Sequence, residues 1–377
     1  MDNMNWNYPT SIWFGFDRIK DIQKACNDLN IKNPLIVTDP GIQKTDIIKK
    51  INSFLNAESQ IYAEVKSNPT GQNVMEGVKY FNNGNHDGVI AVGGGSGMDT
   101  GKGIAFMSGQ NRPIWDFEDI GDYWTRANSQ VIKPIIAIPT TAGTGSEFTH
   151  TSVYKTKQNI KNWLWDELTF FDYVIYIPSF TMNLPKYFTI SSGIDAFDHL
   201  IESLLSLKFD FKNLELCNSG LEAIWYSLPK LVENTNDIDE RKKMILGSGI
   251  AGKAIHYTGC GICHCIAHTL GSLTNVPHGV AVAYGLLHTI EPVLINNKDL
   301  LERFREPFIN LSAEELSIKI KDWIKRLEIN FEIIENKVDF NKFIEVYYLK
   351  DNESMRNNTY YQPSKNDLKK LLNKLWK

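Results

Sequence analysis

The stretch GVIAVGGGSGMDTGKGIA, residues 88–105, decides the fold class. Its apolar start, residues 88–95, predicts a strand buried on both faces, as in a parallel sheet, and its second half predicts a helix. Three consecutive glycines, 93–95, join the two, although a plain strand-to-helix turn needs only one. Without Cβ atoms this turn lets ligand oxygens approach the backbone N–H groups, where the start of the helix adds positive partial charge and Ser96 adds a hydroxyl donor. We therefore interpret the stretch as a phosphate-binding turn, distinct from GxGxxG and from the P-loop.

Similar strands and helices surround this turn. The apolar runs 34–39 and 134–141 predict two further strands, and helical spacing covers 19–30 and 74–83. Strand–helix alternation of this kind predicts βαβ units. After about residue 186 nearly every segment has helical spacing. We predict an α/β domain with a mostly parallel sheet at 1–185, whose phosphate-binding turn suits a dinucleotide, and an all-helical domain at 186–377. The charged segment 299–377 is interpreted as a solvated helical rim without chemistry.

Composition limits the function classes. The chain has 377 residues, enough for two domains, with 42% apolar and 22% charged residues and a net charge of −4. No basic block is present, so we expect no nucleic-acid partner and no membrane surface. We also find no apolar run of about 20 residues that would span a bilayer and no signal-peptide pattern. Five cysteines make no disulfide framework, which predicts a cytoplasmic protein.

Two further segments suit a nucleotide. PTTAGTGSE, residues 139–147, follows a strand and offers the hydroxyls of Thr140, Thr141, Thr144 and Ser146. It is equally well explained as an ordinary polar turn. Asp39 ends the strand at 34–39, where a carboxylate accepts hydrogen bonds from a ribose 2′-OH and repels a 2′-phosphate. A turn-forming Asp before Pro40 explains it equally well.

Histidines are concentrated in the second half. In GICHCIAHTLGSLTNVPHG, residues 261–279, His264 and His268 lie four apart and therefore on one helix face, and a short loop can fold His278 back toward them. A second helix carries Asp195 and His199, again four apart, and Glu202 extends that line.

A carboxylate with several imidazoles is a ligand set for Fe²⁺ or Zn²⁺. Taken alone, Asp195 and His199 suit an ion pair on a helix surface, and a histidine among apolar residues is usually a core residue. The combination of both clusters favours a metal site. Cys263 and Cys265 flank His264 and point away from its face, so we assign them to the core or to the surroundings of the site.

The motifs GGGSGMDTGK, PTTAGTGSE, GIDAFDHLIES and HCIAHTLG…VPHG occur in one order over about residues 10–295. In sequence, order and spacing they resemble the iron-containing (group III) alcohol dehydrogenases. The resemblance implies that Asp195, His199, His264 and His278 bind one divalent metal, Fe²⁺ or Zn²⁺. It thereby makes 1–185 the dinucleotide-binding domain and 186–377 the metal-binding, catalytic domain. It also implies that His268 is not a ligand but a catalytic residue near the nicotinamide and the substrate oxygen.

The resemblance further implies a set of contacts to NAD(P) and a homodimer. Asp39 matches the position whose carboxylate accompanies preference for NAD over NADP. The other implied cofactor contacts are Asn68, Gly94, Gly95, Ser96, Asp99, Lys102, Thr140, Thr141, Thr144 and Lys161.

The implied activity is metal-dependent hydride transfer between a small alcohol or aldehyde and NAD(P). Two related activities stay open: reduction of a charged phosphono- or sulfo-aldehyde, and oxidation of a polyol as by glycerol dehydrogenase. A dehydroquinate synthase has the same cofactors but shows no net NADH formation. A metal or nucleotide sensor would show no turnover with simple alcohols and aldehydes.

Overall fold

The computed structural model describes residues 8–56, 58–157, 160–165 and 167–377. Backbone contacts divide the chain into two units. The sheet unit holds the described residues of Met1–Thr140, Ser146–Gln158 and Asn162–Thr181, and the helical unit holds those of Thr141–Gly145, Asn159–Lys161 and Met182–Lys377. Two short segments from the first half of the sequence therefore belong with the helices.

The sheet unit is built on a parallel sheet whose described strands run in the order β1-β8-β5-β4-β2-β3. The bounds are β1 Ser11–Phe14, β2 Pro34–Val37, β3 Gln60–Tyr62, β4 Gly88–Gly93, β5 Ile135–Pro139 and β8 Tyr173–Tyr176. Strands β2, β4 and β5 are buried at every position, which explains their unbroken apolar sequences. A separate two-stranded sheet pairs β6 (Thr151–Lys155) with β7 (Lys161–Trp165).

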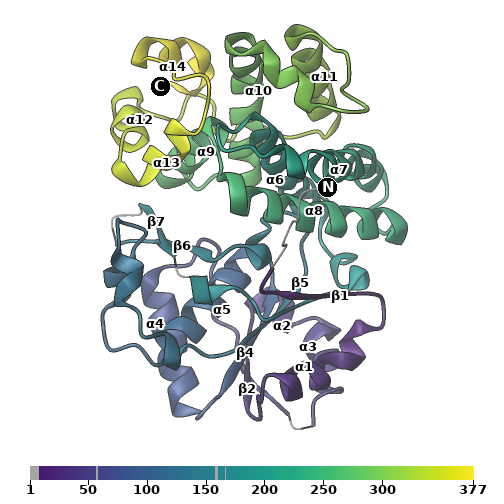
Figure 1. Cartoon of the computed structure of the whole chain (residues 1–377), viewed down its shortest axis with the longest axis vertical. Coiled ribbons are helices and arrows are strands. Elements are labelled where there is room, and N and C mark those ends of the chain that lie inside the picture. Colours follow the sequence, from purple (N-terminus) through teal and green to yellow (C-terminus); the bar gives the residue numbers. More distant parts are fainter. Residues whose placement is uncertain (1–7, 57, 158–159, 166) are drawn as a thin grey trace. The chain divides into compact units, whose positions relative to one another are not determined.

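Helices cover this sheet (Figure 1). The elements are α1 (Ile22–Asp28), α2 (Pro40–Gln43), α3 (Asp46–Asn52), α4 (Gly71–Asn83) and α5 (Gly95–Met107). Isoleucines of α1 and α3 join those of β2, β4 and β5 in one apolar core, while α4 and α5 pack on each other around a second core that includes Val74 and Phe106. Helix α4 begins with a capping box in which Thr70 and Asn73 satisfy each other's backbone N–H groups.

The helical unit contains α6 to α14. Their bounds are α6 Lys186–Leu205, α7 Leu214–Glu233, α8 Ile238–Thr258, α9 Ile262–Leu273, α10 His278–Asn296, α11 Ala313–Arg326, α12 Phe340–Tyr347, α13 Glu353–Asn357 and α14 Lys365–Leu371. Helix α6 contacts α7, α8 and α10, and α9 packs on α10. Of the described helices, α10 alone is long and apolar enough to cross a membrane, with mean hydropathy 1.2, but 67% of that window is buried, as is usual for a core helix.

The predicted fold class, an α/β domain followed by helices, is confirmed. Two details differ. The strand predicted to reach residue 95 ends at Gly93, whose φ of +149° breaks the extended path. The interpretation of residues 299–377 as a solvated rim is wrong in part, because Trp323 stacks on Trp225 of α7 in the core and Asn358 is buried against the turn before α9.

Candidate active site

Helix α6 aligns three polar side chains on one face. Asp195, His199 and Glu202 follow each other at spacings of four and three residues, and all three are buried. The helix can approach its neighbours closely because Gly193 has no Cβ; an added Cβ would lie 2.6 Å from the side chain of Leu228 on α7. The sequence thus places a carboxylate and an imidazole inside an otherwise apolar helix bundle.

The carboxylate of Asp195 faces three imidazoles from three different helices. Its Oδ1 atom lies 3.3 Å from Nε2 of His264, 3.4 Å from Nε2 of His278 and 3.8 Å from Nε2 of His199. His264 comes from α9, and His278 is the first residue of α10, where sequence alone suggested a loop. The structure therefore brings together the four residues that the family resemblance implies as ligands.

These separations suit ligands around one ion better than direct ion pairs. A charge-assisted N–H···O bond is about 2.7–2.9 Å long, shorter than all three distances. Four ligand atoms at about 2.0–2.1 Å from a tetrahedral metal lie about 3.3–3.4 Å from one another. The distances from Asp195 to His264 and His278 match that edge, and His199 is slightly farther away. The donor set, one carboxylate and three imidazoles, also fits Fe²⁺ or Zn²⁺.

Electrostatics in this cluster favour neutral imidazoles beside an ionised carboxylate. Burial lowers the pKa of His199 to about 4 and that of His278 to about 3. Burial would raise the pKa of Asp195, but the facing imidazoles of His199 and His278 lower it overall. His264 differs: burial lowers its pKa, yet Cys260 and the carboxylates of Asp195, Asp198 and Glu202 raise it well above the usual value. A positive charge on His264, or on a metal ion bound to it, is thus stabilised by Asp195 at Nε2 and by Asp198 and Glu202 at Nδ1.

His268 lies beside the cluster without facing Asp195. Its ring centre is 5.3 Å from that of His278 and 6.4 Å from that of His264. No group of described side chains close enough to share an ion includes it. Burial lowers its pKa well below the usual value, and the nearby Lys161 ammonium lowers it further. His268 is therefore a neutral imidazole next to the candidate ligands.

Behind His264 lies a second polar layer that the sequence indicated only weakly. Glu202, Asp198 and Cys263 are buried and close enough to His264 for all four to share an ion, and Cys260 forms another such group with His199 and His264. Burial and the Glu202 carboxylate raise the pKa of Asp198 to about 7. We did not single out Asp198 or Cys260 from the sequence. An acidic residue directly before His199 on α6 was the available signal for Asp198.

The glycine-rich turn is built as the sequence suggested. Gly94 is the N-cap of α5, and no side chain caps this helix end. Gly95 and Ser96 occupy its first two positions. Gly97 lies so near the preceding strand that a Cβ would meet the carbonyl oxygen of Val92 at 3.2 Å. The turn therefore leaves backbone N–H groups at a helix N-terminus, which is a suitable place for a phosphate.

Two residues of α5 that were predicted to contact the cofactor, Asp99 and Lys102, make hydrogen bonds within the protein. The Lys102 ammonium is fully buried and donates to the carbonyl oxygens of Ser146, Thr149 and Thr151 at 2.6, 2.8 and 2.8 Å. Asp99 accepts hydrogen bonds from the Ser146 hydroxyl, at 2.5 Å, and from the backbone N–H of Val153, at 3.1 Å. Both side chains thus fix the segment that follows the second polar loop.

The remaining predicted cofactor contacts are spread over several loops. Asp39 caps α2 by accepting from the N–H groups of Gly41 and Ile42, while its other oxygen lies near Gly93 at the end of β4. Asn68 is exposed, with a positive φ of 53°.

The second polar loop crosses from one unit to the other. The N–H of Thr140 donates to Gly93, whereas Thr141 and Thr144 are grouped with the helical unit. Lys161 is also grouped there, and its Nζ lies 3.4 Å from the place that a Cβ on Gly271 would occupy.

These features define a class of protein: a parallel-sheet unit with a candidate phosphate turn, joined to a helical unit with a candidate metal centre. Known sequences identify the family. The pattern of iron-containing alcohol dehydrogenase matches residues 9–178, and the C-terminal pattern of the Fe-containing alcohol dehydrogenase family matches residues 189–376. The chain belongs to the iron-containing alcohol dehydrogenase family. It is a metal-dependent oxidoreductase that acts on the CH–OH group of alcohols.

Similar proteins agree with this assignment. The chain is 30% identical to alcohol dehydrogenase 4 of Schizosaccharomyces pombe, over 88% of the chain and 78% of that protein. It is 29% identical to 1,3-propanediol dehydrogenase of Klebsiella pneumoniae, over 88% and 87%. Among solved structures, alcohol dehydrogenase from Oenococcus oeni has a TM-score of 0.89 at 26% identity, covering 99% of this chain and all of that one.

Proposed function

We propose that Asp195, His199, His264 and His278 bind one divalent metal ion, Fe²⁺ or Zn²⁺. We propose further that the chain uses it with NAD to interconvert a small neutral alcohol and its aldehyde. The observation that carries this proposal is a single carboxylate oxygen faced by three imidazole nitrogens at 3.3–3.8 Å. The name of the family supports iron, but zinc has an overlapping ligand set.

The metal would supply Lewis acidity, which lowers the pKa of an alcohol hydroxyl or polarises a carbonyl. The chain's own residues supply the surroundings of that chemistry. As ligands all three imidazoles would be neutral, so with one carboxylate a divalent site would keep a net positive charge, which stabilises negative charge on a nearby oxygen. His268 is buried and neutral beside His278, so its unprotonated ring can accept a hydrogen bond from an alcohol hydroxyl and orient it. Its lowered pKa makes it a weak base, so it would relay the proton that an alcohol releases without holding it.

For the cofactor, we propose that the N–H groups at the start of α5, with Gly94, Gly95 and Ser96, bind the pyrophosphate. The second oxygen of Asp39 would meet the ribose 2′-OH and disfavour the 2′-phosphate of NADP. The other proposed contacts are Asn68, Asp99, Lys102, Thr140, Thr141, Thr144 and Lys161; of these, Asp99 and Lys102 would act through the loop segment that they hold.

Metal analysis tests the proposal directly. Protein purified without oxygen should contain one metal ion per chain and form NADH from small alcohols. His264→Ala and His278→Ala should lose both metal and activity, while His268→Ala should keep the metal and lower kcat. Full metal content in the His264 or His278 variant would contradict the ligand assignment. His288→Ala, a change of another partly buried histidine on α10, is the matched control.

A second candidate substrate is an aldehyde that carries a sulfonate or phosphonate. The Lys161 ammonium is close enough to lower the pKa of both His268 and His278, so a cation lies beside the candidate metal centre. It would attract an anionic substrate. The test compares kcat/KM for sulfoacetaldehyde and propanal in wild type and Lys161→Met. If the charged aldehyde is the substrate, wild type prefers sulfoacetaldehyde, and the variant loses this preference.

We propose, finally, two domains divided near residue 185, a cytoplasmic location and a homodimer. Strand β1 lies at an edge of the parallel sheet, and Ile12 on it is exposed, which supports pairing of two copies through this edge. Light scattering on the purified chain tests the dimer, and a monomer mass at micromolar concentration would contradict it.

A further inference from the structure

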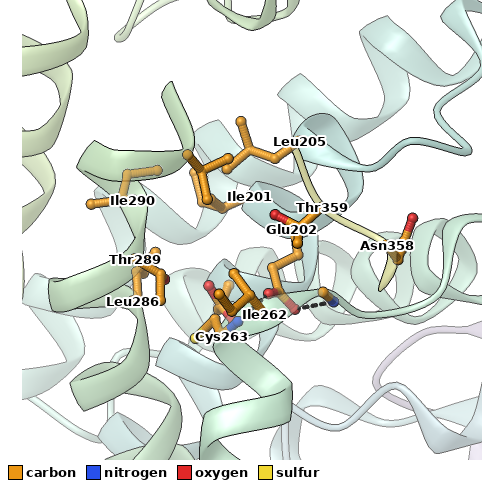
Figure 2. A pocket seen from close by; sticks show the side chains of 13 residues that line it. Ile201, Glu202, Leu205, Ile262, Cys263, Leu286, Thr289, Ile290, Asn358 and Thr359 are labelled. Atoms are coloured by element: carbon orange, nitrogen blue, oxygen red, sulfur yellow. Dashed lines mark hydrogen bonds between the residues drawn. The ribbon is translucent and has the colours of Figure 1, made fainter. Parts of the chain in front are cut away.

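The turn that leads into α9 is held by buried polar side chains from two distant parts of the chain. This turn, residues 258–261, connects α8 with the helix that carries His264. Glu202 of α6 reaches it from one side and Asn358, just after α13, from the other. Figure 2 shows both residues around the small cavity beside this turn.

Glu202 takes the place of a missing cap on α9. The N-cap residue is Gly261, which has no side chain to satisfy the first N–H groups of the helix. The Oε2 atom of Glu202 accepts from the N–H of Gly261 at 2.7 Å, and Oε1 accepts from that of Cys263 at 2.7 Å. A Cβ on Gly261 would lie 2.9 Å from Oε1, so glycine is needed for this approach. A carboxylate at a helix N-terminus is also favoured by the helix dipole.

The same carboxylate contacts the imidazole of His264. Its Oε2 lies 2.8 Å from Nδ1, while Nε2 of the same ring faces Asp195. An ionised carboxylate can only accept, so Glu202 keeps a hydrogen on Nδ1, and Nε2 is the nitrogen that can present a lone pair to a metal ion bound beside Asp195. A histidine ligand needs this tautomer, and a carboxylate on its other nitrogen makes it a stronger donor.

Asn358 fixes the turn from the opposite side. Its amide donates to the carbonyl oxygens of Thr258 and Cys260 at 2.8 and 3.0 Å. Its oxygen accepts from the hydroxyl of Ser206, which follows the end of α6, at 2.8 Å. Asn358 is almost fully buried, so these bonds are not exchanged with water. The C-terminal segment thus ties the turn to the same helix that supplies Asp195 and His199.

We propose that Glu202 and Asn358 are positioning residues of the metal site. They hold the turn at 258–261 so that Nε2 of His264 points to the same metal position as the other three ligands. This inference rests on the proposed role of His264 as a ligand. It gives the C-terminal region, where the sequence showed no chemistry, a function in metal binding.

A second cation between Glu202 and Asp198 is the competing explanation of these buried carboxylates. It is less favourable, because the Glu202 oxygens already accept from two backbone N–H groups and meet His264. The neighbouring cavity is also small, about 20 Å³, and its other lining residues are mostly apolar, among them Ile201, Leu286 and Ile290.

Cobalt binding tests the proposal without using activity. The metal-free chain is loaded with Co²⁺, and stoichiometry, affinity by competition with a chelator, and the visible absorption spectrum are measured. Glu202→Gln should bind Co²⁺ about 10–100-fold more weakly and show a changed spectrum. Its new amide can donate to Nδ1 and favour the tautomer of His264 that cannot bind metal. Asn358→Ala should also weaken binding, by releasing two carbonyl groups of the turn.

Two further variants separate the possible failures. Glu291→Gln makes the same change at a carboxylate on α10 that contacts Lys321, and it should bind Co²⁺ like wild type. His264→Ala should lose the ion; if it keeps the ion, the proposed function itself fails. If His264→Ala loses it while Glu202→Gln and Asn358→Ala keep wild-type affinity and spectrum, the positioning role alone is refuted. Two ions per chain, with the second lost in Glu202→Gln, would also overturn it in favour of a cation site.

Discussion

Gly279, the residue after His278, is a sensitive point of the candidate metal centre. It is buried in the first turn of α10, against α6. In Gly279→Ala the new Cβ would lie 2.5 Å from the carbonyl carbon of Ser191, and its oxygen would be closer still. Carbon atoms separate comfortably at about 3.5 Å, so the two helices must part by about 1 Å, and neither contact is a flexible side chain.

This displacement is large for a metal site. Ligand distances that hold a metal vary by only about 0.2 Å, and His278 is covalently next to the shifted residue. Overpacking of this kind also destabilises a protein by about 1–3 kcal/mol. We therefore expect Gly279→Ala to fold with a lower melting temperature and to contain clearly less metal than wild type when purified in the same way.

Metal analysis and thermal unfolding of the metal-free chain make the comparison. Ala281→Gly, two residues along the same helix, is the control, because it lowers helix stability by about 1 kcal/mol without pushing the helices apart. That control should keep its metal. Wild-type metal content in Gly279→Ala would refute the reasoning, because either α10 yields without moving His278 or His278 is not a ligand.

Three further predictions concern other parts of the chain. Burial lowers the pKa of Lys102 to about 8, so between pH 8 and 10.5 the native chain loses a proton that the unfolded chain keeps. The stability of wild type relative to Lys102→Met should therefore rise with pH across that window, by up to about 3 kcal/mol; a constant difference in urea unfolding would contradict this. Phe197→Ala should destabilise the chain by about 3–5 kcal/mol, since Phe197 is fully buried with its ring centre 4.4 Å from that of Trp323; a loss under about 1 kcal/mol would show that the site collapses. Asp39→Gly should raise kcat/KM for NADP relative to NAD, and an unaltered ratio would remove Asp39 from cofactor selection.

The local sequence pattern was sufficient to predict the central strands of the sheet and the pairing of candidate metal ligands on one helix. Unbroken apolar runs predicted β2, β4 and β5 because strands buried on both faces allow few polar residues. Spacing of four predicted that Asp195 pairs with His199 on α6, since helix geometry alone fixes that proximity. The convergence of α6, α9 and α10 on one point was inferred from family resemblance; periodicity does not contain it.

Features that depend on packing between distant segments were not predictable from one sequence. Nothing in the pattern of residues 141–145 or 160–161 separates them from the sheet unit, yet these described residues group with the helices. Lys102 follows a glycine-rich turn, which favours a ligand contact, but its ammonium is enclosed by carbonyl groups 44–49 residues away in sequence. The partners of a long side chain depend on which loop folds over it.

Asn358 illustrates the same limit at the candidate site. In sequence it stands in MRNNTYYQP, a polar stretch with turn-forming composition, and an exposed loop is the natural interpretation. Its amide instead satisfies carbonyl groups of a turn about 100 residues earlier, next to a glycine with φ of +67° at position 259. A buried turn of this shape cannot satisfy its own carbonyl groups, so a donor must come from elsewhere in the chain. The carbonyl groups of the turn before α9 therefore need a donor from the C-terminal segment, and this connects that segment with His264. The connection depends on the folded structure and cannot be read from the local sequence.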